Sequence, residues 1–236
     1  MNHPSFPHRH AILPVIHVQD ATQAVRDTGI ALEAGCDGVF LFGGGTRAHL
    51  RSPMSVYDAV RSHFPTAWIG VWEGRVPGRD FPLSADGLWT DNAGIDETQE
   101  VQVRAAQDRL ERRKARWRGL YFGGVAFKYQ RPVPEALLPA ACWAASPFMD
   151  FVTTTGPGTG YPPTREKIAI MREALGRHPL AISSGITPEN VGTFLDLADA
   201  FLVATGIEAR WGKLDPARVR ALVDAVRSWR SGLDNR

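Results

Sequence analysis

The sequence predicts an α/β chain folded as a single (β/α)8 barrel, the TIM-barrel architecture, with a shortened third βα unit. Short apolar segments rich in β-branched residues alternate eight times with longer segments whose apolar residues recur at helical spacing. Each short segment is apolar on both faces, as a parallel strand covered by helices must be. One such barrel contains about 250 residues, which matches this chain of 236. We therefore expect one domain over residues 1–236, with a flexible terminus at 1–10.

The eight predicted strands follow one another along the chain without a linker or a break in composition. They are residues 11–18, 37–42, 67–72, 87–91, 119–127, 150–155, 179–183 and 200–204. A doubly wound open sheet is the alternative, and a G-x-G-x-x-G turn after the first strand would favour it. The first strand is instead followed by Gln19, Asp20 and Ala21, so the closed barrel is preferred.

The predicted helices between the strands have clear start signals. Three of them place a capping side chain before a proline, at Ser52-Pro53, Thr187-Pro188 and Asp215-Pro216. The last helix carries an apolar stripe at positions 219, 222, 223 and 226, which would face a sheet. Residues 73–86 contain two prolines and little helical periodicity, so the third helix is expected to be short or missing.

Composition excludes several classes of protein. The formal net charge is +2, which provides no strong field for nucleic acid or an anionic membrane. The cysteines, Cys36 and Cys142, form no C-x-x-C pair, so neither a disulfide framework nor a cysteine zinc site is expected. No apolar run approaches the length of a membrane span and no signal peptide is evident. These features predict a cytoplasmic protein.

A basic run between Arg104 and Arg118 is the local exception to this near-neutral charge. Its arginines alternate with Gln107, Asp108 and Glu111 on one predicted helix, with apolar residues between positions 101 and 110 available for burial. This pattern favours a solvated outer face of a barrel helix. A nucleic-acid surface is the less favoured alternative, because Trp117 is the sole interleaved aromatic residue.

Four ionisable residues stand at strand ends, where a barrel places its chemistry. They are His17, Glu73, Asp91 and Lys128. A carboxylate there can act as a general base, and a lysine can bind an anion or form a Schiff base. Each also has a structural interpretation: a hydrogen-bonded core histidine, an ion pair of Glu73 with a nearby arginine, or a solvated lysine. Asp91 is the preferred base and Lys128 the preferred electrostatic stabiliser.

Two glycine turns after the seventh and eighth strands predict a phosphate site. Barrels often bind phosphate in these two loops through backbone N–H groups. The residues concerned are Ser184, Gly185, Ile186, Thr205 and Gly206. The simpler alternative is that the glycines only turn the chain. A Gly-, Thr- and Pro-rich segment after the sixth strand looks like a loop that covers the ligand, through Thr155, Gly158, Thr159 and Gly160, with a rigid structural turn as its alternative.

No metal site and no cofactor are predicted. The histidines at positions 3, 8 and 10 form a loose cluster in the expected flexible terminus, and no H-x-H or H-E-x-x-H pair lies on a predicted element.

Several of these motifs resemble the BtpA-like proteins, a group placed near the ribulose-phosphate-binding barrels. The segments TTTGPGTGYPP, SSGITPENV and FLDLADAFLVATGIE are similar to the family's TGxxTGxPP loop, SGVTxEN turn and ADGxIVGT strand. The similarity is strong over about residues 150–226 and patchy before, where His17 and Lys128 match. Phe42 and Gly43 replace the family's Glu-Asn pair, and Gly124 and Ala126 replace an Asp and a His. The resemblance implies a phosphate-binding barrel, although the family's name comes from photosystem I biogenesis.

Two functions are consistent with these observations. The first is an enzyme that acts on a small phosphorylated metabolite, of sugar-phosphate or phosphoribosyl type, by proton transfer as an isomerase or lyase. The second is a barrel without catalysis that serves as a ligand-binding or assembly factor, which the replaced polar residues would explain. A homo-oligomer is expected from the 7 tryptophans, several of which would not fit inside one barrel.

Overall fold

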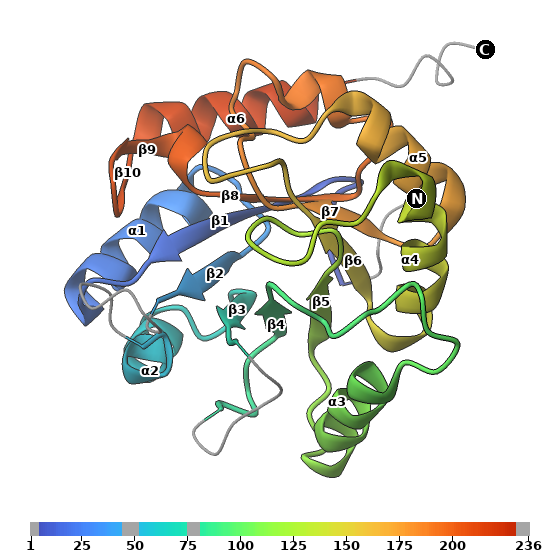
Figure 1. Ribbon diagram of the computed structural model, residues 1–236. Helices are drawn as coiled ribbons and strands as arrows, with labels where there is room; N and C mark the ends of the chain where they lie inside the picture. The colour runs from blue at the N-terminus through green and yellow to red at the C-terminus, as the bar shows by residue number, and fades with distance from the viewer. Residues whose placement is uncertain (1–4, 44–51, 75–80, 230–236) are drawn as a thin grey trace.

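Eight parallel strands form a closed barrel in which each strand pairs with the next along the chain. The computed structural model describes residues 5–43, 52–74 and 81–229. β1 pairs with both β2 and β8, which closes the sheet, and helices surround it (Figure 1). The strands are β1 (Ala11–His17), β2 (Val39–Phe42), β3 (Ile69–Trp72), β4 (Gly87–Thr90), β5 (Leu120–Gly124), β6 (Phe151–Thr154), β7 (Leu180–Ile182) and β8 (Ala200–Val203). The predicted (β/α)8 barrel is confirmed.

Six α-helices and four 3-10 helices occupy the described residues. The α-helices are α1 (Ala21–Glu33), α2 (Met54–His63), α3 (Val103–Lys114), α4 (Leu138–Ala145), α5 (Arg165–Leu175) and α6 (Pro216–Ser228). The 3-10 helices are η1 (Glu135–Leu137), η2 (Ser146–Phe148), η3 (Val191–Phe194) and η4 (Thr205–Ile207). A small antiparallel hairpin, β9 (Glu208–Arg210) and β10 (Lys213–Leu214), follows β8.

The three predicted helix starts have different outcomes. The Asp215 side chain accepts hydrogen bonds from the N–H groups of Ala217 and Arg218, as a helix N-cap should. α2 begins at Met54 with Pro53 at the N-cap position and no side-chain cap. The prediction of an α-helix at Thr187 is wrong, because only the short η3 forms there. Asn190 accepts from the Thr187 N–H and donates to the Gly185 carbonyl, and such side-chain bonds compete with helix formation.

The third βα unit lacks a helix in its described residues, 73–74 and 81–86. Residues 75–80 lie outside the described part of the chain. The Asp86 side chain accepts from the Ile69 N–H and forms an ion pair with Arg61, which ties this connection to α2. The shortened third unit agrees with the paucity of helical signal in the sequence.

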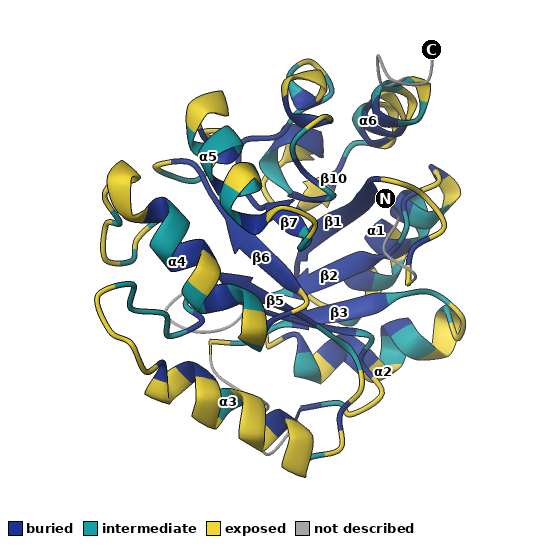
Figure 2. Ribbon diagram, turned by 90° about the vertical axis from the view of Figure 1, so that its right-hand side faces the viewer, coloured by how far each residue is buried: buried dark blue, intermediate teal, exposed yellow. Residues whose placement is uncertain are grey.

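Aromatic side chains fill the interior of the barrel. Phe122 and Phe151 stack with ring centroids 4.3 Å apart, and Phe40 packs edge-on against Phe122 at 5.2 Å. A second apolar layer lies between the strands and the surrounding helices. The sheet is therefore covered on both faces, as Figure 2 shows by its dark blue strands, and as the continuously apolar strand sequences predicted.

The segment that precedes β1 closes the amino-terminal end of the barrel. Phe6 is 4% exposed and its ring lies 5.3 Å from that of Trp68 and 6.2 Å from that of Phe151. His10 is also buried, with its Nδ1 3.0 Å from the Ala198 carbonyl oxygen. Phe6 and His10 are thus part of the core, and the flexibility expected for the terminus stays a prediction. Residues 1–4 lie outside the described chain.

The basic helix α3 is more exposed than its sequence suggested. Val101, Val103 and Leu110 are 71%, 58% and 51% exposed, whereas Ala105 and Arg112 are buried. Figure 2 shows α3 largely in the colour of exposed residues. The burial expected for the apolar residues of this helix is therefore wrong except at Ala105, because an arginine occupies the inner face instead.

In the described part of the chain, no helix combines the length and apolar character that crossing a membrane requires. Both cysteines are buried free thiols, and burial raises the pKa of each to about 12. Thiols with so high a pKa are weak nucleophiles at neutral pH.

Candidate active site

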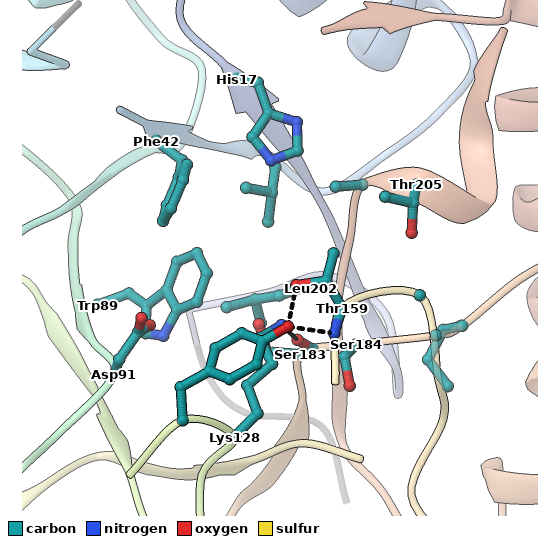
Figure 3. A pocket seen from close by; sticks show the side chains of 16 residues that line it. His17, Phe42, Trp89, Asp91, Lys128, Thr159, Ser183, Ser184, Leu202 and Thr205 are labelled. Carbon is teal, nitrogen blue, oxygen red and sulfur yellow. Dashed lines mark hydrogen bonds between the residues drawn. The ribbon is translucent and has the colours of Figure 1, made fainter. Parts of the chain in front are cut away.

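A cavity of about 70 Å³ opens at the end of the barrel where the strands finish. Side chains from β1, β2, β4 and β8 line it, together with the loops after β5, β6 and β7 (Figure 3). Nine of the predicted site residues line this cavity: His17, Asp91, Lys128, Thr159, Gly160, Ser184, Gly185, Ile186 and Thr205. The fold therefore brings together residues that are up to about 190 positions apart in the sequence.

Four predicted site residues do not line this cavity. Glu73 contributes its backbone N–H to a hydrogen bond with the Trp89 carbonyl. The Thr155 hydroxyl accepts from the Lys128 N–H at 2.7 Å, and this residue lines a neighbouring cavity. Gly158 lies in the loop beside Tyr161, and Gly206 packs under the turn after β7. Thr155 and Gly206 therefore shape the loops around the cavity rather than its wall.

The turn after β7 presents consecutive backbone N–H groups at the cavity. Gly185 has φ +66°, a left-handed conformation that glycine adopts without strain. The N–H groups of Ser184, Gly185 and Ile186 donate to no acceptor in the described part of the chain. Successive N–H groups around a left-handed residue form a concave anion-binding feature, often called a nest.

The loops after β6, β7 and β8 pack closely together at this turn, and their close approach requires glycine at two positions. A Cβ atom on Gly185 would lie 2.0 Å from the Pro162 nitrogen, and one on Gly206 would lie 1.9 Å from the Ile186 carbonyl oxygen. The Ser184 hydroxyl accepts from the Gly156 N–H and donates to the Tyr161 carbonyl, each at 2.9 Å. The Ser184 side chain is thus used within the protein, and the loop after β6 is fixed against the turn.

The loop after β6 is also held from the opposite side by Tyr129. The Tyr129 hydroxyl donates to the Thr159 hydroxyl at 3.2 Å and accepts from the Thr159 N–H at 3.1 Å, as the dashed lines in Figure 3 show. Thr159 and Gly160 therefore form part of the cavity wall.

His17 lies on the wall that faces the glycine turns, and it forms a buried pair with Glu208. The His17 Nδ1 and Glu208 Oε1 atoms are 2.7 Å apart, and the two side chains are 6% and 4% exposed. The Trp211 ring stacks on the imidazole at 3.9 Å, and Phe42 packs edge-on at 5.4 Å. Both Glu208 and Trp211 come from the β9–β10 hairpin. The hairpin thus fixes the orientation of His17.

Asp91 and Lys128 face the cavity from the loops after β4 and β5. The Asp91 Oδ1 accepts from the Trp72 indole N–H at 3.2 Å, and the Lys128 ammonium donates to the Ser183 carbonyl at 3.4 Å. Figure 3 shows Asp91 beside Trp89 and the Lys128 side chain reaching toward Ser183. Asp91 and Lys128 thus line one cavity, whereas Glu73, the third group that would have to meet them there, does not.

Trp89 supplies a buried donor at the same cavity. Its side chain lines the cavity and is 4% exposed, and its indole N–H has no hydrogen-bond partner in the described residues. A buried unsatisfied donor costs about 1–3 kcal/mol. An acceptor atom on a bound ligand would relieve that cost, so the unpaired indole points to a polar group on the ligand.

A buried lysine lies under the loops after β5 and β6, outside this cavity. The Lys167 ammonium donates to the Ala126 carbonyl at 2.7 Å and to the Thr155 carbonyl at 2.8 Å. Burial lowers the pKa of Lys167 to about 8. Lys167 lines the neighbouring cavity of about 520 Å³. It joins two of the loops that form the mouth of the barrel.

Metal-binding side chains are not clustered in the described residues: no three His, Cys, Asp or Glu side chains there could hold one ion. His8 instead pairs with Asp37 at 2.6 Å. His3, the first histidine of the predicted loose cluster, lies outside the described residues.

Comparison with known proteins gives short matches in sequence and long matches in structure. N-(5'-phosphoribosyl)anthranilate isomerase of Pseudomonas aeruginosa is 48% identical over 54 residues, which cover 22% of this chain and 26% of that protein. The isomerase of Moorella thermoacetica is 39% identical over 56 residues, or 23% of this chain and 25% of that protein. The chain thus matches only about a quarter of the length of these relatives. No family profile matches it.

The solved structures show the same barrel over nearly the whole chain. Phosphoribosyl anthranilate isomerase from Thermotoga maritima has a TM-score of 0.63 at 17% identity, covering 92% of this chain and 100% of that one. (S)-3-O-geranylgeranylglyceryl phosphate synthase from Thermoplasma acidophilum, in complex with sn-glycerol-1-phosphate, has a TM-score of 0.63 at 15% identity, covering 93% of both. These structures share the TIM-barrel fold. Both proteins have phosphorylated compounds in their names.

Sequence reasoning missed three of the groups at or near this TIM-barrel mouth. Glu208 and Trp211 lie in a hairpin that follows the eighth strand, where only a turn was expected. Trp89 was one of the 7 tryptophans to which sequence reasoning assigned no individual function. An acidic residue a few positions after the last strand was a signal for Glu208, but only the folded chain shows that it reaches His17.

Proposed function

We propose that this chain is an enzyme that anchors the phosphate of a small phosphorylated metabolite and transfers a proton on the rest of it. The supporting observation is the row of N–H groups at Ser184, Gly185 and Ile186 without an acceptor in the described chain, in the same cavity as a buried histidine–carboxylate pair. The named relatives and neighbours act on or bind phosphorylated compounds, which supports a substrate of sugar-phosphate or phosphoribosyl type.

The phosphate would bind at the turns after β7 and β8. Its oxygens would accept hydrogen bonds from the turn N–H groups and from the Thr205 hydroxyl, which lines the same cavity. Lys128 reaches the end of β7 from the opposite loop and would add a positive charge. Anion binding by N–H groups explains how a chain of net charge +2 can hold a phosphate without a basic surface.

The proton transfer would take place at His17 and Asp91. Because Nδ1 of His17 is engaged by Glu208, the other ring nitrogen, Nε2, is the one left to exchange a proton with the substrate. Figure 3 shows the imidazole directed into the cavity. A carboxylate that orients an imidazole is the usual support for a general acid or base. Asp91, directly after β4, is placed to act as the second proton-transfer group, and the Trp89 indole would donate to a substrate oxygen. These steps fit an isomerase or lyase.

The second function, a barrel without catalysis, is favoured by Gly124 and Ala126, which add no functional side chain at the end of β5. Under that function His17 would be structural, and the BtpA-like resemblance would imply a ligand-binding or assembly factor. The two functions differ in one measurement. A His17→Asn variant that binds phosphate esters as before but turns over none of the substrate supports the enzyme.

The phosphate anchor is tested by titrating the protein with ribose 5-phosphate and inorganic phosphate while following thermal unfolding and the Trp89 indole N–H signal. We expect saturable stabilisation and a saturable shift of the Trp89 signal. Thr205→Asp places a negative charge in the anchor and should abolish the shift of the Trp89 signal, whereas the size-matched Thr205→Val should weaken the binding that this signal reports by about tenfold or less. Equal responses of all three proteins would contradict the proposal.

A further inference from the structure

The basic run on α3 forms one wall of a separate cavity at the opposite end of the barrel from the proposed active site. This cavity has a volume of about 190 Å³. Arg109, Arg112 and Arg113 line one side of it, and Phe148 and Asp150 line the other. Residues 117–121 and 147–150 lead into β5 and β6, so the cavity lies near the amino-terminal ends of these strands, away from the mouth.

Arg112 is a buried guanidinium that has no carboxylate partner among the described residues. The residue is 6% exposed, and it forms no ion pair with a described residue within 4.0 Å. Its Nη2 donates to the Phe148 carbonyl at 2.9 Å, and its Cζ lies 3.8 Å from the centre of the Tyr121 ring. Its Nη1 is buried and has no hydrogen-bond partner in the described chain. Buried charges without a partner are costly and therefore rare in folded proteins.

The charges around Arg112 do not balance it. Arg109 and Arg113 form no ion pair with a described residue, and they add two positive charges to the same cavity. Among the described residues, Asp150 supplies the one carboxylate in the cavity wall, and it accepts the Tyr121 N–H at 2.7 Å. The charges of Asp150 and of Asp108, on α3, both act to raise the pKa of Arg112, but neither carboxylate forms an ion pair with it within 4.0 Å. Burial is the largest influence on Arg112 and lowers its pKa.

A purely structural function explains only part of this arrangement. Basic residues in the last turn of a helix interact favourably with its dipole, and this applies to Arg112, Arg113 and Lys114. It does not account for an arginine turned inward on a helix whose Val103 and Leu110 are left exposed. The inward arginine and the two beside it instead converge on a space large enough for a small anion.

We propose that this cavity is a second anion-binding site, which takes a phosphate-type oxyanion carried by a small molecule. The anion would accept hydrogen bonds from Arg109 and Arg113 and would offset the charge of Arg112 beneath them. The aromatic rings of Trp117 and Tyr121 also line the cavity. An apolar or planar part of the same ligand would pack against these rings. This site is independent of the proposed phosphate anchor at the mouth.

The second site has a direct structural connection to the mouth. Arg112 packs on the Tyr121 ring, and the Tyr121 hydroxyl lies 3.0 Å from the Thr90 hydroxyl. Thr90 is the last residue of β4 and precedes Asp91, which lines the mouth cavity. These contacts join the walls of the two cavities through Tyr121 and Thr90.

Two indole signals report on the two sites in one experiment. Trp117 lines the cavity beside α3, and its indole N–H donates to the Ala85 carbonyl at 2.8 Å. Trp89 instead lines the cavity at the mouth of the barrel. The full chain is titrated with inorganic phosphate while the indole N–H signals of its 7 tryptophans are recorded; Trp117→Phe assigns the relevant one. We expect a saturable shift of the Trp117 signal, with an affinity distinct from that of Trp89.

A charge-matched pair of variants decides between a site and a diffuse basic surface. Arg109→Gln/Arg113→Gln removes two charges from the cavity, and Lys114→Gln/Arg116→Gln removes two from the same run outside it. The first variant should weaken the Trp117 response by about tenfold or more and the second by about twofold or less. Both should leave the Trp89 response unchanged.

Three results would overturn the proposal. The first is a Trp117 signal that does not move at saturating phosphate. The second is an equal loss in the two double variants, which would indicate bulk electrostatics. The third is that a single-stranded oligonucleotide binds more tightly than inorganic phosphate and that both double variants weaken its binding. That result would make the helix a nucleic-acid surface. Arg112→Met adds a further measurement: removing the buried charge should abolish stabilisation by phosphate at this site while the protein alone stays folded.

Discussion

Glu208 Oε1 lies 2.7 Å from His17 Nδ1, and both side chains are almost fully buried at the mouth of the barrel. The same oxygen also accepts from the Gly212 N–H at 3.1 Å. The carboxylate is thus fixed by its own hairpin and in turn fixes the imidazole. Because Trp211 stacks on one face of that ring, rotation of His17 is restricted in two ways. The arrangement leaves the ring with one nitrogen for chemistry.

The first prediction concerns the tautomer of His17. In the native protein, the bond to Glu208 should hold the proton of neutral His17 on Nδ1. Glu208→Ala should move it to Nε2 in part and reduce the free energy of unfolding by about 1–3 kcal/mol, because a buried donor loses its partner. Nitrogen chemical shifts of the ring and urea unfolding measure the two effects. Identical chemical shifts of the His17 ring in the two proteins would show that Glu208 does not set the tautomer. Glu33→Ala, at the exposed end of α1, is the control for the loss of a carboxylate.

The barrel could be predicted from the sequence because its signals are local. Strand periodicity and the cap at Asp215 each depend on neighbouring residues, and the structure reproduces both. The order of the strands then follows from the alternation with helices. The expectation of a helix after Thr187 was wrong because Asn190, three residues later, provides competing hydrogen bonds.

The chemistry of the mouth could be predicted only in part. His17, Asp91 and Lys128 stand at strand ends, where the fold requires functional groups to lie, so position alone identified them as candidates. Glu208 follows His17 by 191 positions, and nothing in the local sequence of either residue indicates the other. The inward orientation of the Arg112 side chain could not be predicted for a similar reason, because the Tyr121 ring on which it packs belongs to β5.

A second prediction concerns the contact between the two glycine turns. Gly206→Ala would place a Cβ atom 1.9 Å from the Ile186 carbonyl oxygen, so backbone must move and stability should fall by about 1–3 kcal/mol. Gly192→Ala is the matched control, because its Cβ would meet nothing within 4 Å. It should leave stability unchanged or raise it by about 0.4–1 kcal/mol. Equal urea midpoints for the two variants would show that the turns are not in tight contact.

A third prediction concerns the closure of the amino-terminal end of the barrel. Phe6→Ala should lower the free energy of unfolding by about 3–5 kcal/mol, because it leaves a cavity between Trp68 and Phe151. Ser5→Ala changes an exposed neighbour and should have an effect within about 0.5 kcal/mol. Urea unfolding of the three proteins tests this. A Phe6→Ala variant as stable as the native protein would mean that the segment before β1 is not part of the core.

The last prediction is a pH dependence carried by Lys167. Burial lowers its pKa from 10.5 to about 8 in the folded chain, so between these two values the unfolded chain binds more protons than the folded one. Stability should therefore rise with pH across this window, by up to about 3 kcal/mol in total for this group. Below pH 8 both states are protonated and the contribution is constant. Lys167→Met should remove this rise, whereas Lys213→Met, at an exposed position in β10, should keep it. Urea unfolding between pH 7 and pH 10.5 measures how the free energy of unfolding changes with pH. If the two variants give parallel curves of this free energy against pH, Lys167 is not a buried lysine that loses its proton on folding.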